Sequence, residues 1–160
     1  MCLETTRKMT KAFRKQNEDK KEITVWKIYL VNKIPHRLEA PYMCKGKYSD
    51  SCFQGHLITE PGIVKSNRGG RPIAYCNDDQ YFPKLKYWTV VKGIHVCLTK
   101  SAAKIHLRKL YHRTSAYMDC VIVPCKAKMK DLVAVDTGSL AVFMKISITP
   151  RNFRKAVTGK

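Results

Sequence analysis

In the segment 22–34, EITVWKIYLVNKI, both sets of alternating positions are largely hydrophobic. Successive side chains of a strand point to opposite faces, so Val25 and Tyr29 fall on one face and Trp26 and Ile28 on the other. A strand that is apolar on both faces is typical of the interior of a sheet. The pattern therefore predicts an interior strand here, with Trp26 in the core.

Shorter strand-like segments follow, separated by glycine, proline and polar residues. FQGHLI at 53–58 is the best short strand of the loop-rich part, and another is expected over 72–76. MDCVIVPCK at 118–126 predicts a strand that Pro124 ends, because proline has no amide hydrogen to donate. LVAVDTGSLAVFMKISIT at 132–149 predicts a strand pair whose DTGS stretch forms a hairpin connection.

One internal segment has the spacing of a helix. From about Ser101, apolar residues gather on one side of a helical wheel and cations lie mostly on the other. The apolar side holds Ala103, Leu107, Leu110 and Tyr111, and the cationic side holds Arg108, Lys109, His112 and Arg113. Thr99 or Ser101 is expected to cap its start, where the helix dipole favours an anion beside Lys100. Such a helix can dock on a sheet and still present its cations.

Strands outnumber the clear internal helix, so the predicted fold class is α+β. We expect a single domain with a twisted, mainly antiparallel sheet, one basic helix packed on it, and a basic N-terminal helix or arm. The predicted organisation is a basic arm or helix at 1–21, an α+β core domain at 22–150, and a basic tail with little to bury at 151–160. A chain of 160 residues with 44% hydrophobic content is long enough for one such domain.

The charge of the chain indicates its class of partner. Lys and Arg number 31 against 12 Asp and Glu, which gives a formal net charge of +19. Solubility alone requires far less, and no acidic residue occurs between Gln80 and Met118. Solvated charged faces normally mix signs, so this segment predicts a cationic surface for a polyanion.

Nucleic acid is the partner class that we expect, and RNA is favoured over duplex DNA. Aromatic residues at Tyr81, Phe82, Tyr87 and Trp88 lie among the cations and can stack on unpaired bases. The predicted nucleic-acid-binding residues are Lys84, Lys86, Lys92, Lys100, Lys104, Arg108, Lys109, His112, Arg113, Arg68, Arg71, Tyr87 and Trp88. For Trp88, a place in the core is an equal alternative.

Arg68 and Arg71 flank a pair of glycines in the stretch SNRGGRPIAYC. One interpretation is a hairpin tip with exposed arginines. The other is a phosphate-contacting loop, because glycine allows backbone amides to approach an anion. The lysine and serine or threonine pattern of a phosphate-binding loop is absent from the sequence.

The chain shows no amino-terminal apolar run, and the apolar stretch 132–148 is interrupted by Asp136 and Lys145, so a soluble, cytoplasmic protein without a membrane partner is expected. Seven cysteines without a C-x-x-C pair favour small buried hydrophobes over a metal site. No cofactor, metal or catalytic residue is predicted. A metal-free nuclease using His106 or His112 with Lys104 is chemically conceivable, but cationic contacts are the preferred interpretation.

Several short motifs are similar to those of a loose group of small uncharacterised phage and prophage proteins. They are the opening MCL, the VWK strand at 25–27, the APY at 40–42, the KGIHVCLT segment at 92–99 and the VIVPC strand at 121–125. The resemblance implies a mobile-element protein that blunts host defence. The heavy charge departs from the group and points to a nucleic-acid-laden target. A CRISPR inhibitor acting on guide RNA or an RNA-guided effector is the sharpest form of this expectation.

The stretch GIHVCLTKSAA at 93–103 resembles the strand-turn-helix of ADP-ribosyltransferases. The resemblance places His95 where that family has an aromatic residue, and Lys27 or Tyr29 at the first nucleotide-binding position. No glutamate follows Glu60, so an aspartate (Asp119, Asp131 or Asp136) would have to replace the family's carboxylate. A divergent transferase, or a protein that sequesters an anionic nucleotide signal, is therefore the alternative function.

Overall fold

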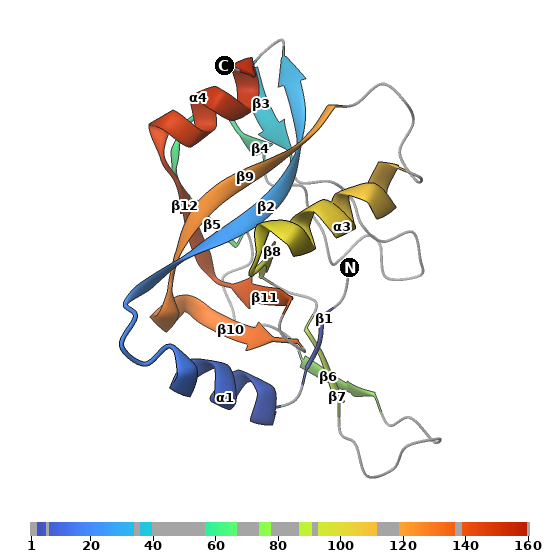
Figure 1. The fold of residues 1–160 in the computed structure, drawn as a ribbon, viewed down its shortest axis with the longest axis vertical. Helices are drawn as coiled ribbons and strands as arrows, with labels where there is room; N and C mark the ends of the chain where they lie inside the picture. Colours follow the sequence, from blue (N-terminus) through green and yellow to red (C-terminus); the bar gives the residue numbers. More distant parts are fainter. Residues whose placement is uncertain are drawn as a thin grey trace.

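The fold was obtained as a computed structural model (Figure 1). The structure describes residues 3–5, 7–33, 36–39, 57–66, 74–77, 87–90, 93–111, 119–136 and 139–159. Strands exceed helices in this part of the chain, and the strands pair antiparallel. The predicted single α+β domain with an antiparallel sheet is confirmed.

Most of the described strands form one open sheet with the order β10-β11-β8-β2-β9-β12-β5. The bounds are β2 Glu22–Lys33, β5 Gly62–Lys65, β8 Ile94–Cys97, β9 Asp119–Lys128, β10 Leu132–Val135, β11 Leu140–Phe143 and β12 Lys145–Ile148. Two further strands extend this sheet beside the end of β2: β3 (His36–Glu39), which pairs with β2, and β4 (Leu57–Ile58), which pairs with β3. A smaller sheet has the order β1-β7-β6, with bounds Leu3–Thr5, Tyr87–Val90 and Ala74–Asn77.

Strands β2 and β9 are the centre of the large sheet and pair without a break from Glu22↔Lys128 to Val31↔Asp119. Val25 and Tyr29 are fully buried on one face of β2, and Ile28 is buried on the other. The predicted interior strand is confirmed because both of its faces are covered.

Pro124 does not end β9, which continues to Lys128, so this expectation was wrong. The carbonyl oxygen of Pro124 accepts a hydrogen bond from Asn152 Nδ2 at 2.9 Å, on the edge of β9 that faces away from β2. The N–H and C=O of one strand residue point to the same side, so the missing N–H also lies away from β2. The central β2·β9 ladder therefore loses no hydrogen bond at this proline.

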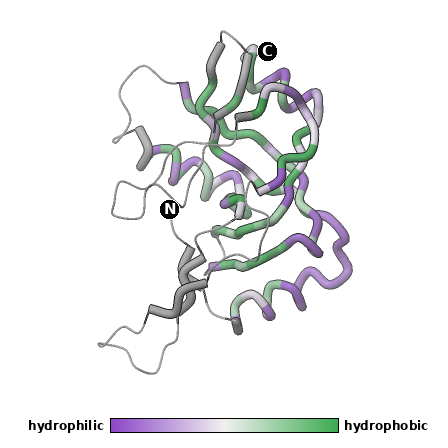
Figure 2. The backbone as a smooth tube through the Cα atoms, turned by 180° about the vertical axis from the view of Figure 1, so that it is seen from behind, coloured by the Kyte–Doolittle hydropathy of each residue, from purple (hydrophilic) through white to green (hydrophobic). Residues whose placement is uncertain are grey.

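In the described part of the chain, three helices lie against these strands (Figure 1). They are α1 (Arg7–Gln16), α3 (Lys100–Tyr111) and α4 (Pro150–Thr158), and a short 3-10 turn, η1 (Met129–Asp131), joins β9 to β10. Helix α3 packs with Trp26 and Ile28 on one face of β2, whereas α4 packs with Val25 and Tyr29 on the other. Figure 2 shows the resulting pattern, with hydrophobic central strands and a hydrophilic turn after α1.

The N-terminal segment is attached to β10 by side chains as well as by packing. Arg14 donates to the carbonyl oxygen of Leu132 at 2.8 Å, and the amide of Val135 donates to Thr10 Oγ1 at 3.3 Å. Phe13 packs against the main core cluster. The predicted N-terminal helix is therefore present, and it is preceded by the unexpected short strand β1.

Helix α4 corrects the expectation that the C-terminal segment has little to bury. Phe153 and Val157 are buried against the main core. Thr149 caps the helix by accepting from the Asn152 amide, and Gly159, in the left-handed conformation at φ 73°, ends it. The spacing of Phe153 and Val157, one helical turn apart, is the signal that the cationic composition concealed.

Asp136 Oδ1 accepts hydrogen bonds from the amides of Ser139 and Leu140 at 3.0 and 2.8 Å. Strand β10 pairs with β11, as the predicted DTGS hairpin requires.

None of the helices that the structure describes is long and apolar enough to cross a membrane.

Candidate nucleic-acid interface

The outer side of α3 carries a row of cations. Lys100, Lys104 and Arg108 are all exposed and follow one another at intervals of four residues, so they run along one side of the helix. Ile105 is 54% exposed beside this row. We call these three cations the α3 row.

The inner side of α3 fixes the direction in which the row faces. Ala102 and Ala103 are buried against Cys97 and Trp26, and Leu107 packs against Ile28 and Cys120. Alanine at the contact allows the helix to approach β2 and β8 closely, while the longer cationic side chains point to solvent. The predicted sides of the helix are confirmed at the three side chains that the structure describes: Ala103 and Leu107 on the apolar side and Arg108 on the cationic side.

The start of α3 is fixed by Thr99. Its Oγ1 accepts from the amide of Ala102 at 3.1 Å, and its carbonyl oxygen accepts from the amide of Ala103 at 3.1 Å. Of the two predicted caps, Thr99 therefore performs this role. The positive end of the helix dipole lies beside Lys100, which favours a negative ligand at this end.

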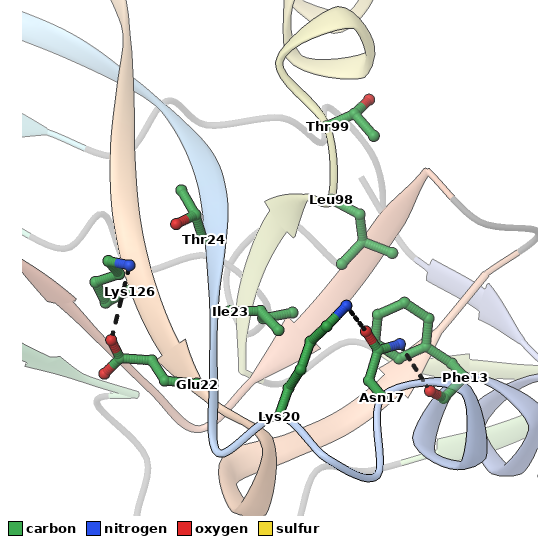
Figure 3. Close-up of a pocket in the computed structure, with 9 residues that line it drawn as sticks. All are labelled: Phe13, Asn17, Lys20, Glu22, Ile23, Thr24, Leu98, Thr99 and Lys126. Atoms are coloured by element: carbon green, nitrogen blue, oxygen red, sulfur yellow. Dashed lines mark hydrogen bonds and ion pairs between the residues drawn. The ribbon is translucent and has the colours of Figure 1, made fainter.

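A groove of about 490 Å³ opens at this end of α3 (Figure 3). Its lining comes from the end of α1 and the following turn, the start of β2, the β8–α3 connection and β9. The lining residues are Phe13, Asn17, Lys20, Glu22, Ile23, Thr24, Leu98, Thr99 and Lys126.

Hydrogen bonds hold the polar side chains of this groove. Lys20 Nζ donates to Asn17 Oδ1 at 3.1 Å, and Asn17 Nδ2 donates to the carbonyl oxygen of Phe13 at 2.9 Å. Across the groove, Lys126 Nζ lies 3.9 Å from Glu22 Oε1. The groove thus combines apolar surface with cations at two places on its rim.

The structure describes the side chains of only part of the predicted site. Lys100, Lys104 and Arg108 are brought together and exposed as predicted. Lys109 belongs to the last part of α3, and Tyr87 and Trp88 belong to β7, where Trp88 is paired with Thr5 and Cys76. Outside the described residues lie Lys84, Lys86, Lys92, His112, Arg113, Arg68 and Arg71.

Lys20, Lys126 and the groove between them were not predicted from the sequence. Their segments are far apart in the chain, and no spacing rule connects them. A weak signal did exist, because a cap was expected at Thr99 and an anion beside Lys100. Both features lie at the edge of this groove.

On the face of β2 that carries Val25 and Tyr29, Lys27 donates from Nζ to the carbonyl oxygen of His95 at 2.8 Å. Burial lowers the pKa of Lys27 to about 8. The three cysteines whose side chains the structure describes, Cys97, Cys120 and Cys125, are free and buried, as predicted for small hydrophobes.

Burial raises the pKa of Cys97 to about 11 and that of Cys125 to about 12, so both remain protonated thiols near neutral pH. Protonated thiols are poor nucleophiles. Their burial places both groups in the core.

Comparison with known proteins identifies no relative: no family model matches the chain, and no curated protein or solved structure matches it.

Proposed function

We propose that this protein binds RNA through the exposed face of α3. The observation that carries the proposal is the α3 row, three exposed cations on one side of a helix whose other side is buried in the sheet. Such a row can contact successive phosphates of a polyanion and release its condensed counterions.

Two other helices also expose cations, and their surroundings differ from those of α3. Helix α1 exposes Lys8, Lys11 and Lys15, but the acidic Glu18 and Asp19 follow directly after it and are exposed as well. Helix α4 exposes Arg151, Arg154 and Lys155. Helix α3 lies in the longest acid-free stretch of the sequence, 80–118, and α4 lies in a shorter one, 137–160.

RNA is the preferred nucleic acid because aromatic residues interleave with the cations at 81–88, a stretch that ends in β7. Aromatic rings stack on bases that are unpaired, and these occur in single strands and loops of RNA more than in duplex DNA.

The test compares three matched triple variants, each of which removes three exposed positive charges. They are K100Q/K104Q/R108Q on α3, K8Q/K11Q/K15Q on α1 and R151Q/R154Q/K155Q on α4. Binding to a labelled single-stranded RNA is measured by fluorescence anisotropy over a series of salt concentrations. Thermal unfolding confirms that each variant folds.

We expect the α3 variant to lose the most affinity. The slope of log K against log salt should become shallower by about 2, because each phosphate that a cation no longer neutralises reduces it by about 0.7. The α1 and α4 variants should retain most of the affinity. An equal loss in all three would indicate unspecific attraction by net charge and would overturn the assignment to α3. Absence of RNA binding by the wild type would overturn the function itself.

In the cell, this RNA binding would serve counter-defence: the protein would bind guide RNA or an RNA-guided effector. Purification without nuclease, followed by sequencing of the RNA retained at low and high salt, tests it. Enrichment of guide RNA supports this role, whereas a protein free of nucleic acid at low salt contradicts it.

A further inference from the structure

The groove at the start of α3 has a composition suited to one nucleotide. Phe13, Ile23 and Leu98 give it carbon surface, which includes the one aromatic ring of its lining. Lys20 and Thr99 supply polar atoms on the rim (Figure 3). Its volume, about 490 Å³, lies within the usual range of ligand sites.

Charge divides the groove into two ends. At one end, Glu22 Oε1 lies 3.9 Å from Lys126 Nζ, so an acidic group accompanies this lysine at the surface. At the other end, Lys20 donates to the neutral amide oxygen of Asn17 and forms no ion pair with it, although the exposed acids Glu18 and Asp19 precede it in the same turn. The helix start at Thr99 adds amides with a positive partial charge.

The groove is continuous with the α3 row. Thr99 lines the groove and caps the helix, and Lys100, the first cation of the row, follows it directly. A chain of phosphates lying along the row therefore reaches the groove at its Thr99 edge.

We propose that this groove holds one unpaired nucleotide of the RNA strand bound along α3. The base packs against Phe13, Ile23 and Leu98, and its phosphate lies between Lys20 and the start of α3, away from Glu22. This inference rests on the proposed function and adds a requirement to it: the RNA must offer an unpaired base at a fixed place relative to the helix.

The experiment scans a short single-stranded RNA of fixed sequence with one abasic nucleotide at each position in turn. Affinity is measured for the wild type, for Phe13→Leu and Lys20→Gln, and for the triple variant K100Q/K104Q/R108Q. Phe13→Leu removes the ring but keeps apolar contact with the core, and Lys20 is exposed, so its replacement leaves the fold intact.

For the wild type, we expect about 5-fold or greater loss of affinity at one abasic position and little change elsewhere, since stacking of one base contributes roughly 1–3 kcal/mol. Phe13→Leu and Lys20→Gln should bind the intact RNA less tightly, and their affinity should no longer depend on the abasic position. The triple variant should bind weakly, but its affinity should still depend on that position.

Several outcomes would overturn the inference. If the wild type binds RNA and loses the same affinity at every abasic position, the groove does not hold a nucleotide, but the proposed RNA binding through α3 still stands. If the wild type binds no RNA, both the groove proposal and the proposed function are wrong. Saturable binding of free adenosine or cytidine monophosphate, with no position dependence in RNA, would assign the groove to a free nucleotide instead.

Discussion

Lys27 is a charged residue on the core face of the central strand, where a lysine is favoured only if it is neutral or hydrogen-bonded. Its neighbours on the same face, Val25 and Tyr29, are fully buried. Among the described residues, the buried hydroxyl of Tyr29 has no hydrogen-bond partner. The interior of β2 thus contains two polar groups that burial disfavours in their charged forms.

The pH dependence of stability should reveal Lys27. Its pKa is about 8 in the folded protein against 10.5 in the unfolded chain, so the unfolded state binds more protons between these values. Stability therefore rises as pH increases through this window. From about pH 8 upward the buried thiols Cys97, Cys120 and Cys125 oppose this gain, because burial raises their pKa values and they begin to ionise first in the unfolded chain.

Both proteins carry these thiols, so the effect of Lys27 is the difference between the wild type and Lys27→Met. Measured by urea unfolding, the free energy of unfolding of the wild type should rise relative to that of Lys27→Met by on the order of 1 kcal/mol from pH 8 to pH 9. If the two proteins change in parallel, Lys27 is not the responsible group.

Gly93 is required at the turn into β8 for two reasons. Its φ of +113° is one that L residues rarely adopt, and a Cβ there would lie 2.4 Å from Val142 Cγ1. Gly93→Ala should therefore destabilise the protein by roughly 2–4 kcal/mol. Gly62→Ala is the matched control, because Gly62 has φ +145° but open space around it. Equal losses in chemical denaturation would show that backbone strain alone acts at Gly93.

At the scale of elements, the sequence predicted the strands and helices whose own hydrophobic spacing shows which side is buried. The apolar run of β2 and the amphipathic spacing of α3 were sufficient, because each encodes its own buried face. The cap at Thr99 and the turn at Asp136 were also predictable, since a side chain there bonds to amides three or four residues away.

Features that depend on distant partners were not predictable in this way. Pro124 is compatible with β9 only because its missing N–H faces away from β2. The groove joins segments from α1, β2, β9 and the β8–α3 connection, and no local pattern brings these together. The helix α4 was hidden by the abundance of cations around two buried residues.

Helix α4 should behave as part of the core. Phe153→Ala removes a buried ring from the main cluster, and we expect it to cost about 3 kcal/mol of unfolding free energy. Arg154→Ala, at the next and exposed position, should change stability by less than about 0.5 kcal/mol. Thermal and urea unfolding of both variants checks this. Equal, small effects would mean that α4 is detached in solution.

At the scale of the whole molecule, the net charge of +19 acts on both stability and binding. Like charges repel within the compact state, and added salt screens them. We therefore expect the melting temperature to rise between about 50 and 300 mM salt while RNA affinity falls. Calorimetry and anisotropy on the same samples test this opposition. A melting temperature that falls with salt would show that attractive ion pairs dominate.

The pairing of β2 with β9 also has a consequence for how the chain folds while it is being synthesised. Residues of β2 leave the ribosome long before those of β9, their principal partner, so the loop between them must close late. During that interval a strand with two apolar faces has no complete sheet to join. We expect slow folding of the newly made chain and capture of this strand by chaperones that recognise extended apolar segments.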